Sequence, residues 1–78
     1  MKNTDTLRDN VETALEHYFT SLEGQAPEKL HELVIKETEI GLLKTVMRHA
    51  QGNQSQAATW LGLARGTLRK RLRDYNII

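Results

Sequence analysis

The chain has 78 residues, 38% hydrophobic and 27% charged, a length that fits one small domain or a subunit that completes its core with a partner. No apolar run approaches the ~18 residues that a membrane span needs, and the polar, then amphipathic, N-terminal segment has the character of neither a secretory signal nor a transit peptide. We therefore expect a soluble, cytoplasmic protein. The absence of cysteine excludes disulfides, thiolate catalysis and cysteine-ligated zinc, which leaves oligomerisation as the means of stabilising so short a chain.

The two halves of the chain carry opposite charge, although the whole chain carries only +1. Residues 1–47 contain five bases and nine acids, a net charge of −4, whereas residues 48–78 contain six bases and one acid, a net charge of +5. A basic C-terminal third indicates an anionic partner. On charge alone, a solvated charged face remains an equal alternative.

The chain is predicted to be all-α, because it has one proline, five glycines and no strand-like alternation. The first predicted helix covers about residues 6–22, where apolar residues recur every three or four positions and form one stripe. Thr6 and Asp9 offer an imperfect capping box at its start, and Gly24 provides a stop just past its end.

The second predicted helix covers about residues 27–50, with Pro27 in its first turn. Such a helix would be roughly 36 Å long, against a diameter near 30 Å for a compact globule of this size, which favours a dimer. Its apolar residues change face near Gly41, which either permits a bend or close helix approach or is merely tolerated. The first half is expected to pack on the first helix and a partner chain, and the second half to support the segment after Gly52. The apolar residues are Leu30, Leu33, Val34 and Ile40 in the first half, and Leu43, Val46, Met47 and Ala50 in the second.

Residues 52–72 have the spacing of a helix-turn-helix. A short helix is expected to begin at Asn53 or Gln54, Gly62 to make a tight turn with positive φ, and a last helix to begin near Arg65. The predicted inward-facing residues are Ala57, Ala58 and Leu61 in the short helix, Leu63 between the helices, and Leu68, Leu72 and Tyr75 in the last helix.

Basic side chains occupy every direction of the last helix outside its apolar stripe. A helix that lies on a membrane surface needs a broader apolar face with aromatic anchors, so DNA is the better ligand. Gly66 adds no side chain at the exposed N-terminal turn, so the backbone there could lie against a groove wall.

The run Arg65-Gly66-Thr67-Leu68-Arg69-Lys70, together with Gly52-Asn53-Gln54, Ala57-Ala58 and Tyr18-Phe19, gives the chain a family resemblance. Residues 6–75 resemble Fis, the bacterial nucleoid-associated DNA-bending protein family. The last third alone is also similar to the DNA-binding domain of NtrC-type activators, which has the same fold.

The resemblance implies a four-helix subunit and a homodimer on double-stranded DNA. Residues 1–50 would form the intertwined dimerisation helices, and residues 51–78 a helix-turn-helix unit in the major groove. It implies a global transcription regulator of the nucleoid that bends DNA, with weak sequence preference; a specific regulator or activator-type domain is the alternative. Arg65 would read guanine. The other implied contacts, to phosphates or groove walls, come from Asn53, Gln54, Ser55, Thr67, Arg69, Lys70, Arg71 and Arg73.

The chain departs from the family pattern at four positions. Ala64 stands where these proteins carry asparagine, which removes polar discrimination from that side chain. Gln56 and Asp74 replace bases and so weaken binding, and Gly41 stands where a kink proline is expected, which makes the bend in the second helix shallower. The N-terminal β-hairpin arm that activates DNA invertases in some members has no counterpart, so that activity is not expected.

Catalysis, cofactors and a small-molecule substrate are not expected. His17, His31 and His49 lack metal-ligand spacing. Trp60 is expected to pack or to be partly exposed, with base stacking as the alternative. Four acids fit a solvated helix face: Glu28, Glu32, Glu37 and Glu39.

Overall fold

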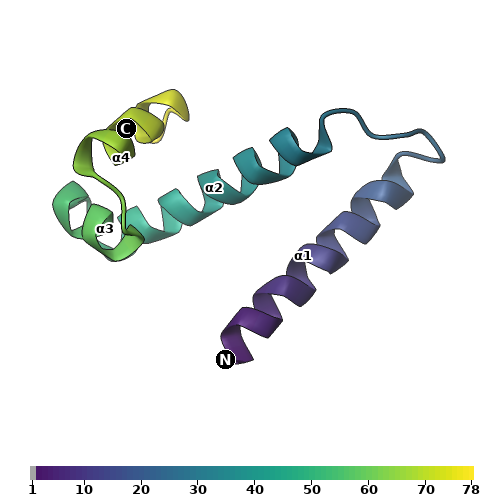
Figure 1. The fold of residues 1–78 in the computed structure, drawn as a ribbon, viewed down its shortest axis with the longest axis horizontal. Helices are drawn as coiled ribbons and strands as arrows, with labels where there is room; N and C mark the ends of the chain where they lie inside the picture. Colours follow the sequence, from purple (N-terminus) through teal and green to yellow (C-terminus); the bar gives the residue numbers. More distant parts are fainter. Residues whose placement is uncertain (1) are drawn as a thin grey trace. The chain divides into compact units, whose positions relative to one another are not determined.

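The computed structural model describes residues 2–78, with side chains described from Thr6 onward, and these residues form four α-helices and no strand (Figure 1). The all-α prediction is confirmed. The chain divides into two compact units between Leu30 and His31. In the described part of the chain no helix is long and apolar enough to cross a membrane. The helices are α1, Lys2–Ser21; α2, Leu30–His49; α3, Gln54–Leu61; and α4, Arg65–Asp74.

Helix α1 begins at Lys2, so Thr6 lies inside the helix and the predicted capping box with Asp9 is wrong. The helix extends to Lys2 because the sequence before Thr6 contains no glycine or proline to stop it. Its C-terminal end agrees with the prediction: α1 ends at Ser21, and Gly24 follows with a φ of +87°. Along α1 the apolar stripe is only half-buried, and Leu7 and Phe19 are exposed.

Helix α2 begins at Leu30, three residues later than predicted, and Pro27 lies in the segment before it rather than in its first turn. Lys29 has a φ of +50°, a left-handed conformation that does not continue into a helix and therefore sets the boundary. With 20 residues, α2 is roughly 30 Å long instead of 36 Å. The length of α2 is therefore no argument for a dimer. The argument for a dimer rests on exposed apolar side chains instead.

The two halves of α2 differ in burial, and the predicted change of face is confirmed for the second half. Leu43 and Ala50 are buried, and Val46 and Met47 pack against the same core. In the first half and around Gly41, by contrast, large side chains reach the surface. A Cβ built at Gly41 would meet no atom within 4 Å, so no described residue of the C-terminal unit approaches that glycine closely. The exposed side chains are Leu33, Ile35 and Leu42.

A small core of buried side chains joins α2, α3 and α4. In Figure 1, α3 and α4 lie at the C-terminal end of α2. Leu43, Leu68 and Leu72 are fully buried, and burial of such a side chain stabilises a fold by about 1.5–3 kcal/mol. The adjacent Ala57 and Ala58 are also buried, and their small size allows α3 and α4 to cross closely, as predicted. The residues that pack around this core are Val46, Met47, Leu61, Tyr75 and Ile77; Leu63, expected between the helices, is only half-buried.

The turn between α3 and α4 has the predicted form. Gly62 caps α3 with a φ of +73°, and its N–H donates to the carbonyl oxygens of Ala58 and Thr59. The N–H of Leu63 also donates to the Ala58 oxygen, at 3.0 Å, which satisfies the last turn of α3. Only Gly62, Leu63 and Ala64 separate the two helices, the short connection of a helix-turn-helix.

Replacing Gly62 by alanine should lower the free energy of unfolding by about 1 kcal/mol, because an L side chain is strained at this positive φ. A Cβ at Gly62 meets no atom within 4 Å, so crowding plays no part. Gly66→Ala is the matched control: Gly66 lies inside α4 with equally open space, and the change should stabilise by up to about 1 kcal/mol. Urea unfolding of both variants at one protein concentration tests this pair, and a stabilised Gly62→Ala would contradict it.

Candidate nucleic-acid interface

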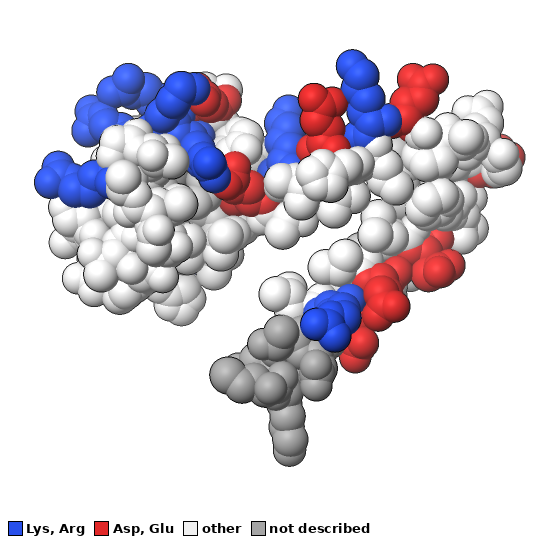
Figure 2. Space-filling view, viewed as in Figure 1, with Lys and Arg blue, Asp and Glu red and all other residues white. Residues whose placement is uncertain are grey.

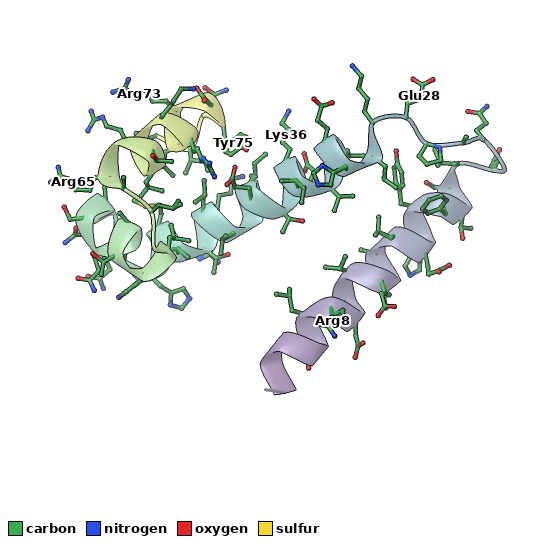
Figure 3. All side chains as sticks on the ribbon, in the orientation of Figure 1. Arg8, Glu28, Lys36, Arg65, Arg73 and Tyr75 are labelled. Carbon is green, nitrogen blue, oxygen red and sulfur yellow. The ribbon has the colours of Figure 1, made fainter. Side chains whose placement is uncertain are left out.

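Half of the ten residues of α4 are basic, and the core determines where they point. Leu68 and Leu72 turn inward and are fully buried, so the remaining directions of the helix are left to polar side chains. Figure 2 shows Lys and Arg gathered over α4, and in Figure 3 Arg65 and Arg73 point away from α2. The five bases are Arg65, Arg69, Lys70, Arg71 and Arg73; all except Arg71 are exposed.

The N-terminal turn of α4 is open to a ligand. Ala64, the N-cap residue, has no side chain that could accept a hydrogen bond from the first amides of the helix. Arg65, Gly66 and Thr67 follow it and are all exposed. Uncapped amides at a helix N-terminus favour an anion such as a phosphate. This end of α4 therefore combines free N–H donors, one guanidinium and a stretch of bare backbone.

Three further residues that were predicted to contact DNA lie next to one another at the start of α3: Asn53, Gln54 and Ser55. Asn53 is the N-cap of α3, and its Oδ1 accepts a hydrogen bond from the Gln56 N–H at 3.0 Å. The carbonyl end of this side chain is thus occupied, whereas its amide end can still donate. Ser55 and Gln56 are exposed and Gln54 is half-buried. The roles of Asn53, Gln54 and Ser55 in DNA contact stay predictions.

Lys70 and Asp74 form an ion pair one turn apart on the exposed side of α4, with 2.9 Å between Nζ and Oδ2. Their side chains are 77% and 53% exposed. Pairs of this kind on a helix contribute only about 0.3–0.5 kcal/mol, because water screens both charges. Lys70 can therefore exchange Asp74 for a phosphate at little cost.

Arg71 differs from the other bases of α4 because it is held by α2. Its Nη1 pairs with Oε2 of Glu39, and the hydroxyl of Tyr75 donates to Oε1 of the same carboxylate at 2.6 Å. This hydrogen bond, together with partial burial and the negative charge of Glu39, raises the pKa of the Tyr75 phenol above its usual value near 10.

The prediction that Glu39 lies on a solvated helix face is wrong, since Glu39 is half-buried and bonded to two side chains from the C-terminal part of the chain, Arg71 and Tyr75. The sequence did contain a signal: Glu39 precedes Leu43 by four residues and so shares the face of α2 that packs on the core. Trp60, on α3, is 54% exposed, in agreement with the prediction of partial exposure. Among the described residues, no group of three or more His, Asp or Glu could hold a metal ion.

The chain matches two family models and many curated proteins. Residues 34–75 match the bacterial regulatory protein family Fis, and residues 2–27 match the N-terminal domain of DNA-binding protein Fis. A protein of Pseudomonas aeruginosa described as a Fis-like DNA-binding protein is 52% identical over 73 residues, which cover 94% of this chain and 70% of that protein. DNA-binding protein Fis of Glaesserella parasuis is 51% identical and that of Vibrio atlanticus 48% identical, each over 71 residues that cover 91% of this chain and 72% of the relative.

Proposed function

The chain belongs to the Fis family of bacterial DNA-binding regulators, and on this basis we propose that it is a homodimeric, nucleoid-associated protein of the cytoplasm that binds and bends double-stranded DNA. In this role it regulates transcription globally, with weak sequence preference. The observation that carries the proposal is α4, a ten-residue helix with five bases, held in a helix-turn-helix by a buried leucine stripe. Such a helix presents positive charge in the geometry that enters a major groove.

Dimerisation through residues 1–50 is supported by apolar surface that this chain leaves uncovered. Five large apolar side chains of α1 and α2 are between 38% and 62% exposed. The three of these side chains that belong to α2 lie outside the core of the C-terminal unit. Exposed large apolar side chains on both helices are the kind of surface that a second copy of the chain would cover. The five residues are Leu7, Phe19, Leu33, Ile35 and Leu42.

On DNA, the exposed N-terminal end of α4 enters the major groove and Arg65 donates two hydrogen bonds to a guanine. Residues of α3 and the other exposed bases of α4 contact phosphates and set the register. Ala64 adds no polar contact beside Arg65, which is in keeping with weak sequence preference. The proposed phosphate and groove-wall contacts are Asn53, Gln54, Ser55, Thr67, Arg69, Lys70 and Arg73.

Bending follows if the two recognition helices of the dimer lie closer together than successive major grooves, about 34–36 Å apart on straight DNA, as the family resemblance implies. Both helices then reach their grooves only when the duplex curves toward the protein, and flexible sequences are preferred. A shorter end-to-end distance of a doubly labelled duplex on binding would report this bend.

The principal alternative is a helix-turn-helix domain of the activator type that acts at specific promoters. The match of residues 2–27 to the N-terminal domain of DNA-binding protein Fis favours the Fis-like role, because an activator's DNA-binding unit needs only the C-terminal helices.

The dimer should sediment at micromolar concentration with twice the 8.9 kDa mass of the chain. Leu42→Glu should shift it toward monomer, because the charge would be desolvated where Leu42 meets the partner. Trp60→Glu is the matched control: Trp60 is equally exposed but lies on α3, outside the dimerisation helices, and should leave the mass unchanged. A folded wild-type monomer at this concentration would rule out the dimer.

Arg65→Ala should cost affinity and also the preference for guanine, by roughly 1–3 kcal/mol of discrimination in each half-site. Arg73→Ala should weaken binding to all duplexes alike, because Arg73 contacts phosphate. Competition binding on duplexes changed one base pair at a time distinguishes the two effects. If Arg65→Ala weakened every duplex equally, Arg65 would be a phosphate contact and another residue would read the base.

A further inference from the structure

We propose that Glu39 is a positioning residue for DNA binding, which fixes the rotation of α4 about its own axis by holding Arg71 and Tyr75, and that Arg71 serves this anchor instead of contacting a phosphate. The inference rests on the proposed DNA-binding function and assigns part of the placement of α4 to a residue of α2.

The anchor joins one carboxylate to two successive turns at the C-terminal end of α4. Arg71 and Tyr75, the C-cap residue, are four residues apart and therefore lie on the same side of the helix, one turn from each other. Arg71 Nη1 contacts Oε2 of Glu39, and the Tyr75 hydroxyl contacts Oε1. In Figure 3 Tyr75 lies on the side of α4 nearest α2. Two attachment points one turn apart resist both rotation and tilt, whereas a single one would act as a pivot.

The anchor is also the less exposed of the two ion pairs that α4 makes with described residues. The side chains of Arg71 and Glu39 are 42% and 20% exposed, whereas those of Lys70 and Asp74 are 77% and 53% exposed. Water screens a half-buried pair less, so it holds its geometry more firmly. Tyr75 adds apolar contact, because its ring packs against the core formed with Leu68 and Leu72.

The position of Arg71 around α4 separates it from Lys70 and Arg73. At 100° per residue, Arg71 lies about 65° from the centre of the stripe formed by Leu68, Leu72 and Tyr75, whereas Lys70 lies about 165° and Arg73 about 135° away. The charge of Arg71 is already matched by Glu39. Arg71 thus points toward the core of the protein and pairs with Glu39, whereas Lys70 and Arg73 point away from the core.

Small rotations of α4 would matter for binding. A side-chain atom about 5–6 Å from the helix axis moves by about 2 Å when the helix turns by about 20°. That displacement exceeds the narrow range of hydrogen-bond distances, so Arg65 would lose its hydrogen bonds to the guanine. The bases beside phosphates act through charge over the Debye length of about 8–10 Å and would keep their contribution to the salt dependence. Release of Glu39 should therefore weaken binding although Glu39 itself touches no DNA.

The test is a double-mutant cycle in DNA affinity on the full chain. Glu39→Gln and Arg71→Met should each lower affinity by about tenfold, the scale of one charged hydrogen bond. The double variant should bind DNA no more weakly than the single variant with the lower affinity, because both changes break the same anchor. The control cycle pairs Glu39→Gln with Arg73→Met, which removes the same charge from an exposed position, and its losses should multiply.

The salt dependence of binding gives a second readout, which separates an anchoring residue from a residue that contacts phosphate. Arg73→Met should reduce the slope of log affinity against log salt by about 0.9 for each phosphate that the variant no longer contacts. Arg71→Met should leave the slope at its wild-type value. Tyr75→Phe changes no charge at neutral pH and keeps the aromatic ring. It should lower DNA affinity about three- to fivefold and leave the salt slope and the helix content unchanged. If Arg71→Met does not fold, the double-mutant cycle of Tyr75→Phe with Glu39→Gln tests the anchor in its place.

The inference is overturned if the losses of Glu39→Gln and Arg71→Met multiply, if Arg71→Met reduces the salt slope as Arg73→Met does, or if the folded variants bind like wild type. In each of these results the wild-type protein still binds DNA, so the proposed function stands. A wild-type protein that binds no duplex DNA would instead overturn the proposed function and this inference together.

Discussion

The burial of Leu68 and Leu72 is the interaction on which the rest of the C-terminal unit depends. These two side chains, with Leu43 of α2 and the paired alanines of α3, form almost the whole buried core. Because a core of six buried residues supplies little stability, every local feature around it must agree with it. The left-handed Gly62 brings the start of α4 to the core, and Asn53 fixes the start of α3. Positions that the core does not use are left for a ligand.

The positive charge of α4 destabilises the free helix and also favours its binding to DNA. Arg65, Arg69 and Arg73 follow one another at intervals of four residues, an arrangement in which like charges repel and destabilise a helix. Asp74 and Glu39 offset two of the five bases through their ion pairs. The remaining positive charge is uncompensated within the described residues. Phosphates would neutralise it, so the feature that weakens the free helix also favours its complex with DNA.

The sequence predicted the helix-turn-helix well because small residues mark it without ambiguity. Positions 57 and 58 need small side chains for the close helix crossing, and position 62 needs a residue that tolerates positive φ. The structure places Ala57, Ala58 and Gly62 as expected. Helix starts were predicted less well. The residues before Thr6 include no helix breaker, so α1 extends to Lys2. Lys29 has a left-handed backbone conformation that its residue type does not predict, and α2 therefore begins after Pro27. Such boundaries depend on the chain conformation around them rather than on one residue.

The role of Glu39 was missed because the acids of the second helix were considered together as a solvated face. Its partners, Arg71 and Tyr75, are more than thirty residues away in the sequence, and only the packing of α4 on α2 brings them to it. Periodicity within one helix identifies the buried face but not which distant side chain meets a polar residue at its edge. Polar contacts between elements are therefore the part of this site that needed the structure.

The salt dependence of wild-type affinity tests most directly whether bases held on a buried leucine stripe bind the phosphates of duplex DNA. If Arg69, Lys70 and Arg73 of each subunit contact phosphate in a dimer, log affinity should fall linearly with log salt with a slope of about −5. A slope near zero, measured on a duplex that the protein binds, would show that the basic face of α4 is not the DNA-binding surface and would contradict the account.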